Sequence, residues 1–322
     1  MSKIGILLTN TGTPAAPTQK AVRHYLREFL SDKRVISLPK FLWLPLLYGI
    51  ILPLRPRQSV KLYQKIWRQD GSPMRVIMQK LALQLQKNLT QKNTDMIVEI
   101  GMNYGHPSLK EGLNHLYQKK VEKIIVLPLF PQYSNVTTAS SFDRLTAALK
   151  KWPALPEICL IRDYKDHEDY IYALALSMEN TWEKKGKPQH LLISFHGIPE
   201  RLIREGDPYA ISCEQTAKKL AHQLNLSSHQ WTLCYQSRFG YKKWLKPSTH
   251  DLLKALPQQG IKKIHVICPG FAVDCLETLE EIEIRGQETF LNAGGESLHY
   301  ISALNDDHAQ IEMLAKIVLA RV

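Results

Sequence analysis

The stretch LLISFHGIPE, residues 191–200, has the pattern of a buried β-strand that ends at a histidine. Apolar and β-prone residues lead up to Ser194, and Pro199 prevents regular structure from continuing much further. The pattern therefore places His196 at the carboxyl end of a strand. In parallel α/β proteins, this is the edge of the sheet where loops carry the groups that contact ligands.

A second stretch, ILLTNTGTP at residues 6–14, aligns with the first one at its apolar positions, at a glycine and at a proline. VEKIIVLPLF at 121–130 aligns in a similar way with IKKIHVICPG at 261–270. The two halves of the chain therefore look like one unit used twice. The first half is longer between its matched strands, and the natural candidate for the insertion is the apolar segment at 41–54. Chance similarity between short apolar strands is the alternative.

Strand-like runs rich in β-branched residues recur along the chain. They cover residues 3–10, 96–103, 123–130, 157–164, 190–197, 230–237, 263–270 and 298–305. Segments with helical spacing lie between them, for example at 108–120, 170–185 and 213–224. This alternation predicts an α/β fold of two tandem, doubly wound domains, each with a parallel sheet flanked by helices, and a ligand cleft at the carboxyl ends of the strands.

Length and composition agree with a folded protein of this kind. The chain has 322 residues, of which 44% are hydrophobic and 22% charged, and this excludes a disordered chain. Lys and Arg number 42 against 30 Asp and Glu, a formal net charge of +12. The excess suggests an anionic partner, such as nucleic acid, an anionic membrane face or a substrate with carboxylates or phosphates, unless it serves solubility alone.

The cysteines and the N-terminus indicate the compartment. The five cysteines include no C-x-x-C pair, so the sequence predicts neither a disulfide framework nor a zinc or cluster site. The opening MSKIGILLTNTG has the pattern of a first strand rather than of a signal peptide. We therefore expect a cytoplasmic protein.

The longest apolar run is FLWLPLLYGIILPL, residues 41–54. Pro45, Gly49 and Pro53 interrupt it, and it is shorter than the roughly 20 residues that a membrane-spanning helix needs. Its composition, with Arg55 directly behind it, fits a lip that contacts a membrane surface or an apolar ligand. A plain core helix is the alternative.

Several common nucleotide and metal motifs are missing from the sequence. No G-x-G-x-x-G follows the first strand, and no G-x-x-x-x-G-K-[ST] occurs. HEDYI at 167–171 begins like the helix of a zinc protease but has Ile171 in place of the second histidine. These absences disfavour a dehydrogenase, an NTPase and a zinc protease.

An acidic segment, PGFAVDCLETLEEIEIRG at 269–286, follows another predicted strand. Asp274, Glu277 and Glu281 have the spacing that places three carboxylates on one face of a helix. A solvated acidic face near a helix N-terminus is the ordinary explanation. Beside a histidine at a strand end, the carboxylates instead indicate a path for a divalent cation or for protons. One histidine and one carboxylate are too few to hold a metal permanently, which implies a metal that passes through.

Motifs that run in order from residue 7 to about residue 305 resemble those of the ferrochelatase family, whose members insert ferrous iron into a porphyrin to make haem. The motifs are LLTNTGTP (7–14), QDGSP (69–73), FPQYS (130–134), SFHGIP (194–199), GDPY (206–209), QSRFG with the WL and proline behind it (236–247) and PGFAVDCLETLEEI (269–282).

The resemblance implies two Rossmann-like domains around a cleft. The N-terminal domain would cover 1–150, with an apolar lip insertion at about 31–75 that handles the porphyrin and approaches the membrane. The C-terminal domain, 151–305, would carry the catalytic histidine and the acidic helix, and a C-terminal helix would follow at 306–322.

Carried over residue by residue, the family's catalytic histidine falls on His196 and its essential acidic residue on Glu277. Glu281 lies one turn further along the acidic helix, and all three are implied to contact the metal. The positions implied to bind the porphyrin are Arg55, Tyr63 and Ser72, together with Thr11 and Tyr133 at strand ends of the first half.

The chain departs from the family pattern at two positions. Asn103 stands where many relatives have arginine, which puts one polar contact in doubt, and Cys275 stands where some relatives have histidine. The sequence ends at KIVLARV without the cysteine-rich tail of the animal enzymes. We therefore expect no iron–sulfur cluster and no permanently bound cofactor, with Fe(2+) as a substrate.

The implied reaction inserts ferrous iron into protoporphyrin IX to form protohaem and releases two protons, which is the terminal step of haem biosynthesis. His196 would accept a pyrrole proton or briefly ligate iron, and Glu277 and Glu281 would conduct protons or metal. Arg55 and the basic excess suit the propionates of a porphyrin. The expected partners are porphyrin, iron and, through 41–54, the inner face of a membrane, with no nucleic acid. A chelatase for another tetrapyrrole or metal and a haem or iron carrier without catalysis are the alternatives.

Overall fold

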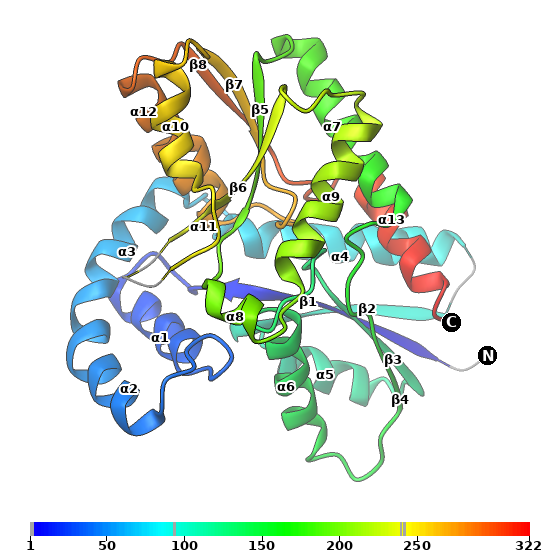
Figure 1. The fold of residues 1–322 in the computed structure, drawn as a ribbon. Helices are drawn as coiled ribbons and strands as arrows, with labels where there is room; N and C mark the ends of the chain where they lie inside the picture. The colour runs from blue at the N-terminus through cyan, green and yellow to red at the C-terminus, as the bar shows by residue number, and fades with distance from the viewer. Residues whose placement is uncertain (1–2, 93–94, 239, 241–242) are drawn as a thin grey trace. The chain divides into compact units, whose positions relative to one another are not determined.

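The computed structural model describes residues 3–92, 95–238, 240 and 243–322 (Figure 1). In these residues the strands form two four-stranded sheets, and every pairing is parallel. The first sheet has the order β2-β1-β3-β4, with β1 (Ile4–Thr13), β2 (Met96–Gly105), β3 (Lys123–Pro128) and β4 (Glu157–Leu160). The second has the order β6-β5-β7-β8, with β5 (His190–His196), β6 (Trp231–Gln236), β7 (Lys263–Ile267) and β8 (Ser297–Ile301). All the predicted strands are confirmed, with ends that differ by a few residues.

The chain divides into two compact units, each built around one sheet. The first unit comprises residues 1–129, 135–163 and 314–322, and the second comprises 130–134 and 164–313. β1 and β5 occupy the same place in their sheets, and so do β3 and β7. These are the strands that the internal sequence alignment pairs, so the predicted repeat is confirmed in the topology.

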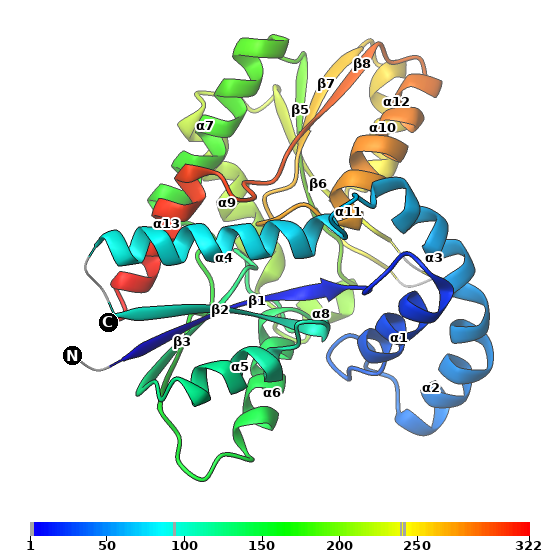
Figure 2. The same ribbon diagram turned by 180° about the vertical axis from the view of Figure 1, so that it is seen from behind.

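Helices cover both faces of the first sheet. α5 (Leu109–Gln118) and α6 (Thr138–Leu149) lie on one side, and α4 (Pro73–Gln91) lies on the other (Figure 2). On the α5 and α6 side, Leu113, Val126 and Leu145 belong to one buried core cluster. Burial from both sides explains why the strands have nearly continuous apolar sequences.

The apolar segment at 41–54 forms one helical stretch of α2 (Lys40–Leu46), the π-helix η1 (Leu47–Ile51) and the start of α3 (Leu52–Ile66). With α1 (Gln19–Leu30) and α4, it lies between β1 and β2, whereas α8 (Glu200–Arg204) and α9 (Tyr209–Gln223) are the helices between β5 and β6. These extra helices lie at the place in the chain where the sequence predicts the insertion. Phe41 is 76% exposed and Leu54 is 61% exposed. The alternative interpretation of this segment as a plain core helix is therefore wrong.

No helix within the described ranges has both the length and the apolar composition that a membrane crossing requires.

The second sheet is also covered on both faces (Figure 1). α7 (Glu168–Lys185) and α9 pack together on one side. On the other side, residues of α10 (Thr249–Gln258) and α12 (Arg285–Asn292) share a core cluster with the strands. The short α11 (Leu276–Thr278) and the π-helix η2 (Leu279–Ile284) lead from β7 into α12, and α13 (His308–Leu319) runs from the second unit into the first.

Candidate functional site

His196 is the last residue of β5, and its backbone pairs in register with Gln236, the last residue of β6. The next residue, Gly197, donates its amide to the Gln236 carbonyl at 2.7 Å, and a Cβ at this position would lie 2.8 Å from the same oxygen. Only glycine fits this close approach. The prediction that His196 ends a buried strand is confirmed, and its partly buried ring lies 6.4 Å from the Phe271 ring between centroids.

The neighbouring backbone selects the tautomer of His196. Its Nδ1 lies 2.6 Å from the carbonyl oxygen of Gly197. Because a carbonyl oxygen only accepts hydrogen bonds, Nδ1 carries the proton in the neutral ring. The lone pair is then on Nε2, which is the nitrogen able to accept a proton or bind a metal.

Gln236 connects the strand of His196 to Glu277. Its side chain is 2% exposed, and Nε2 donates to the main-chain carbonyl of Glu277 at 2.7 Å. Its Oε1 accepts hydrogen bonds from the Ser194 hydroxyl at 2.8 Å and from the Cys268 thiol at 3.3 Å. The structure therefore brings the segments of His196 and Glu277 to the same end of the second sheet.

The carboxylate of Glu281 is held by Ser237, the residue that follows β6. The Ser237 amide donates to Oε1 at 2.8 Å, and its hydroxyl donates to Oε2 at 2.5 Å. Ser237 has a φ of 64°, in the left-handed region that residues with a side chain rarely adopt. Glu281 itself lies on the π-helix η2. π-Helices are rare in proteins, and those that occur often lie at functional sites. Glu277 and Glu281 are thus both tied to the end of β6.

A cavity of about 220 Å³ in the second unit borders this carboxylate. Ser237, His250, Glu281 and Arg285 are among its lining residues. Burial lowers the pKa of His250, and nearby cations add to the shift. Glu281 therefore faces a small polar space beside the end of the sheet.

Asp274 does not join the acidic face. It is 3% exposed, and its carboxylate accepts hydrogen bonds from the hydroxyls of Tyr300 at 2.7 Å and Thr278 at 2.9 Å and from the Asn305 amide at 2.7 Å. The prediction of three carboxylates on one helix face is wrong here, because α11 begins only after Cys275. Asp274 holds the preceding loop in place instead.

Two of the predicted substrate residues, Arg55 and Tyr63, lie on α3 in the first unit. Burial lowers the pKa of Arg55, and the nearby Tyr63 partly opposes this shift. The Tyr63 ring packs edge to face against Trp67, with 6.2 Å between centroids. The structure therefore brings this pair together.

Two further predicted residues, Thr11 and Ser72, lie near the carboxyl end of β1. Thr11 belongs to the strand and is partly exposed, and its amide donates to the Asn10 side chain at 2.7 Å. Ser72 precedes α4, and its hydroxyl lies 2.8 Å from the hydroxyl of Thr13. Both predicted residues therefore lie at the sheet edge where ligand groups were expected.

Tyr133 lies in the segment 130–134, which groups with the second unit although the sequence-based limits place it in the first half. The neighbouring Ser134 donates to the carboxylate of Asp207 at 2.8 Å. Asp207 is 8% exposed and also accepts the amide of Tyr209 at 3.0 Å. The GDPY motif thus fixes the segment that carries Tyr133.

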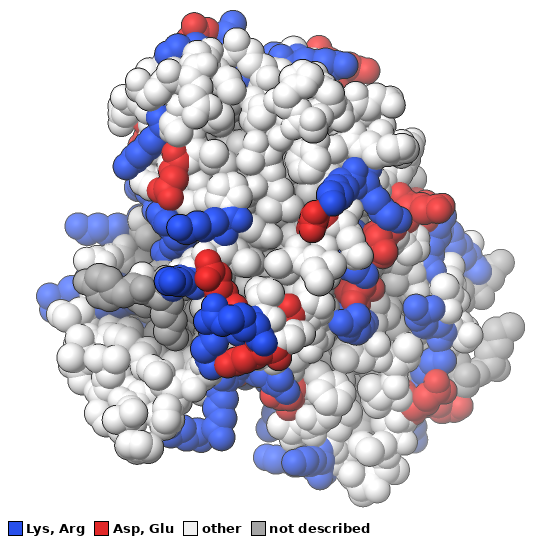
Figure 3. Space-filling view, viewed as in Figure 1, with Lys and Arg blue, Asp and Glu red and all other residues white. Residues whose placement is uncertain are grey.

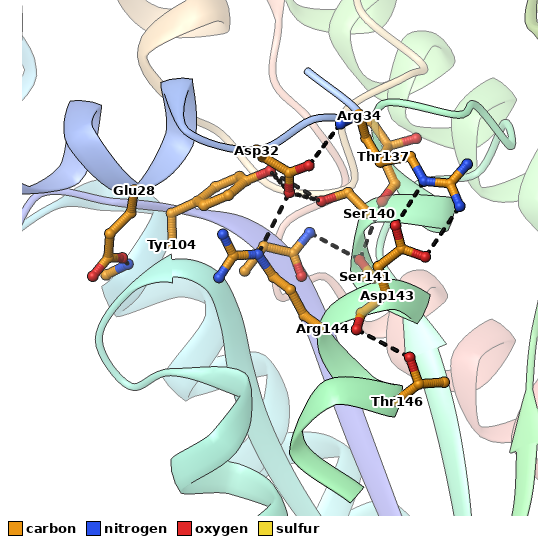
Figure 4. A network of polar contacts seen from close by, with 12 residues as sticks. Glu28, Asp32, Arg34, Tyr104, Thr137, Ser140, Ser141, Asp143, Arg144 and Thr146 are labelled. Atoms are coloured by element: carbon orange, nitrogen blue, oxygen red, sulfur yellow. Dashed lines mark hydrogen bonds and ion pairs between the residues drawn. The ribbon is translucent and has the colours of Figure 1, made fainter. Parts of the chain in front are cut away.

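Polar contacts fix the start of the lip within the first unit (Figure 4). Asp32, two residues after α1, accepts hydrogen bonds from the hydroxyls of Tyr104 at 2.9 Å and Ser140 at 2.7 Å. Burial and the nearby Asp32 raise the pKa of Tyr104, so the phenol keeps its proton and donates. Arg34 forms two hydrogen bonds with Asp143, at 2.8 and 3.0 Å. The segment that leads from α1 into the lip is therefore held in place by contacts with β2 and α6.

Sequence patterns do not single out Gln236, Ser237 or Asp207 as site residues. The available signals are motif and position. Gln236 and Ser237 begin the QSRFG motif at the end of a predicted strand, and Asp207 belongs to the GDPY motif. Phe239 of the QSRFG motif lies outside the described residues. Across the ranges that the structure describes, no three His, Cys, Asp or Glu side chains are grouped so as to hold a metal ion.

Comparison with known proteins gives a consistent result. The family model described as Ferrochelatase matches residues 3–322. A ferrochelatase of Aeromonas hydrophila subsp. hydrophila is 52% identical over 317 residues, which cover 98% of each chain. A ferrochelatase of Vibrio atlanticus is 50% identical over 316 residues, covering 98% of this chain and 97% of its own. The chain belongs to the ferrochelatase family.

The fold agrees with this membership. The structure of SirB from Bacillus subtilis with Fe3+ is similar at a TM-score of 0.55 and 13% identity, covering 98% of this chain and 94% of that one. This similarity concerns the fold alone. The predicted class, two Rossmann-like parallel sheets flanked by helices, is confirmed, and so is the ferrochelatase resemblance.

The two departures from the ferrochelatase pattern have different surroundings. Asn103 is 4% exposed, and its amide donates to the Ser141 hydroxyl at 2.9 Å. Cys275 is 3% exposed, and burial together with Glu277 raises the pKa of its thiol. Cys275 is therefore a buried, protonated thiol beside Glu277.

Proposed function

We propose that this ferrochelatase inserts ferrous iron into protoporphyrin IX, with His196 and Glu277 as its catalytic residues. The observation that carries the proposal is the position of His196 at the end of β5, with the lone pair on Nε2 and with Glu277 tied to the same sheet end. Metallation removes two pyrrole protons, for which a base is needed. It also transfers a divalent cation, which carboxylates can bind along its path. These residues supply both.

In this proposal, His196 accepts a pyrrole proton through Nε2 or ligates the incoming iron briefly. Either role needs the neutral ring, and the hydrogen bond to Gly197 leaves the lone pair on the required nitrogen. Glu277 and Glu281 conduct protons outward or metal inward. Because Ser237 occupies both oxygens of Glu281, this carboxylate acts along the path rather than at the ring centre.

The porphyrin-binding residues of the proposal are Arg55, Tyr63, Ser72, Thr11 and Tyr133. Arg55 keeps its positive charge and can bind a propionate through paired hydrogen bonds. Its partial burial removes screening water and strengthens this attraction. Thr11 is partly exposed and offers a hydroxyl donor. Tyr63 and Ser72 are buried, and the Ser72 hydroxyl is engaged with Thr13.

The proposal includes no permanently bound cofactor. An iron–sulfur cluster is held by cysteine thiolates. Cys213, Cys234, Cys268 and Cys275 are buried, and their burial raises the pKa of each thiol. These side chains are therefore buried thiols, and the proposal assigns iron the role of a substrate only.

We also propose a cytoplasmic location with peripheral contact between segment 41–54 and the inner face of a membrane. The exposed apolar side chains of this segment, such as Phe41, support the contact. Exposed apolar groups next to basic ones suit a lipid surface or an amphipathic porphyrin better than nucleic acid, which is bound chiefly through its phosphates.

Anaerobic incubation with ferrous iron and protoporphyrin, followed by absorbance, tests the function. We expect a haem-type spectrum that grows over many turnovers, well above the uncatalysed rate. A clear preference for coproporphyrin in the same assay would identify a chelatase for another tetrapyrrole. Haem or iron bound once per protein, without turnover, would identify a carrier and overturn the proposal.

A further inference from the structure

Two histidines face each other at the middle of β7 and β8. His265 and His299 are paired in register on these parallel strands, so their side chains point to the same face of the second sheet. Their rings lie 5.2 Å apart between centroids, with an angle of 78° between the ring planes. His265 is 3% exposed, and His299 is partly buried. The second sheet therefore holds an imidazole pair that lies outside the motifs of the ferrochelatase pattern.

The pair lies away from the candidate functional site. Val266 and Leu298 alternate with the two histidines along their strands and belong to the core cluster that includes residues of α10 and α12. The histidines therefore point to the opposite face of the sheet, which α7 covers (Figure 1). His265 pairs with Leu191, five positions before His196 on β5. At about 3.3 Å per residue, the pair is about 17 Å from His196 along the strand direction.

One nitrogen of this pair has no partner in the protein. Nδ1 of His265 is buried and forms no hydrogen bond with any residue that the structure describes. The layer around it is apolar, since Ile193, Ile267 and Ile301 on the same face are each 2% exposed or less. A buried polar atom without a partner costs free energy, and native proteins nearly always satisfy such atoms. The partner of this nitrogen therefore comes from outside the chain.

The spacing of the two rings suits a shared zinc ion. Zn²⁺ binds a histidine nitrogen at about 2.0–2.1 Å and is usually tetrahedral in proteins. The ion then lies about 3.2 Å from the centre of each ring, so two ligating rings have centroids about 5 Å apart. The 5.2 Å between His265 and His299 agrees with this value. Imidazole is also a ligand that this class of metal prefers.

We propose that His265 and His299 form a metal site distinct from the catalytic one, which binds Zn²⁺ and links β7 to β8. Nδ1 of His265 and one ring nitrogen of His299 supply two ligands, and water completes the tetrahedron. His299 is partly exposed on an edge strand of the sheet, so the ion and its water reach the pair from solvent. Two neutral ligands hold the ion reversibly. The site does not rest on the proposed metallation, because it uses neither His196 nor an acidic residue.

Calorimetric titration of the full chain with Zn²⁺, in the absence of iron and porphyrin, tests the proposal. The parent should bind one zinc ion more per chain than His299→Leu does. His299→Cys keeps a zinc ligand at this position and should restore that ion. The matched control is His222→Leu, at an exposed position on α9, which should bind like the parent. His265→Leu should lose the same ion as His299→Leu, so the result does not depend on one variant.

Competing zinc sites are limited. Within the described ranges no three His, Cys, Asp or Glu side chains are grouped to hold a metal, and on the face shown in Figure 3 acidic side chains are scattered among basic ones. Zn²⁺ should also raise the unfolding temperature of the parent more than that of His299→Leu, because the pair exists only in the folded chain. Equal zinc counts in the parent, His299→Leu and His265→Leu overturn the proposal and assign water as the partner of the His265 nitrogen.

Discussion

The side-chain amide of Gln236 donates to the main-chain carbonyl of Glu277 across 2.7 Å. The backbone of Gln236 is also paired in register with His196. One buried residue is therefore paired with the candidate base through its backbone and with Glu277 through its side chain. This relationship arises because β5 and β6 are parallel neighbours that end at the same edge of the sheet. The sheet, rather than a long loop, therefore sets the spacing of the candidate site.

Replacement of Gln236 should damage both stability and catalysis. Gln236→Leu leaves the buried Glu277 carbonyl without its donor, so we expect the free energy of unfolding to fall by about 1–3 kcal/mol. The kcat should fall more than the KM for porphyrin changes. Gln258→Leu is a matched control, because Gln258 donates to the Ala293 carbonyl at 2.8 Å from an exposed position. Denaturant unfolding and metallation kinetics measure both quantities, and a parental kcat in Gln236→Leu would separate this residue from the site.

Two substitutions at Ser237 separate its hydroxyl from its backbone. Ser237→Ala and Ser237→Gly both remove the hydrogen bond to Glu281 Oε2, and we expect kcat to fall about three- to tenfold in each. Ser237→Gly should unfold at a higher temperature than Ser237→Ala, because a residue with a Cβ at a φ of 64° costs about 1–2 kcal/mol. Ser227→Ala, at an exposed turn, is the control. If kcat is unaffected in both variants, Ser237 does not position Glu281.

Asp274 should prove structural, and Glu281 functional. Asp274→Ala leaves the buried donor of Thr278 and the partly buried donors of Tyr300 and Asn305 without their acceptor, so we expect a loss of about 3 kcal/mol in unfolding free energy. Its KM for iron should stay within about twofold of the parent value. Glu281→Gln should instead change the iron dependence of the rate with little effect on stability. The opposite pattern, an altered KM for iron in a fully stable Asp274→Ala protein, would show that Asp274 takes part in metal transfer.

Stability should fall in weak acid because of His265. Burial, and secondly His299 at 5.2 Å between ring centroids, lower the pKa of His265 from 6.5 to about 4. Between these two values the unfolded chain binds a proton that the folded chain does not, so stability is lost as the pH falls below about 6.5. The loss between pH 7 and pH 5 should be about 1–2 kcal/mol smaller in His265→Leu than in the parent.

Denaturant unfolding at these two pH values measures the effect of His265. His308→Leu is the control, because the His308 side chain is 88% exposed. Parallel pH dependence in His265→Leu and the parent would show that other groups, and not the buried His265, carry the acid sensitivity.

The fold follows from the sequence because parallel strands buried on both faces have apolar runs that end at turn residues. LLISFHGIPE shows this relation, since β5 ends at His196 where Gly197 meets the Gln236 carbonyl. The lip could be located because an insertion into a repeated unit interrupts the alignment of its strands.

The site could be predicted only in part. Helical spacing assumes a helix over the whole acidic segment, but α11 starts after Asp274 and continues as a π-helix, so the three carboxylates do not share a face. The roles of Gln236 and Ser237 depend on hydrogen bonds to residues more than forty positions away, which no local pattern contains. Tyr133 follows a strand of the first sheet, yet its segment groups with the second unit through contacts such as Ser134 with Asp207.

Anaerobic metallation by His196→Ala, measured beside porphyrin affinity, tests the central claim most directly. The claim is that Nε2 of His196 accepts the pyrrole proton or passes on the iron. The account predicts that kcat falls by about 10²–10⁴ while the Kd for protoporphyrin stays within about threefold. His308→Ala should behave like the parent. A His196→Ala protein that metallates protoporphyrin at the parental rate would contradict the account.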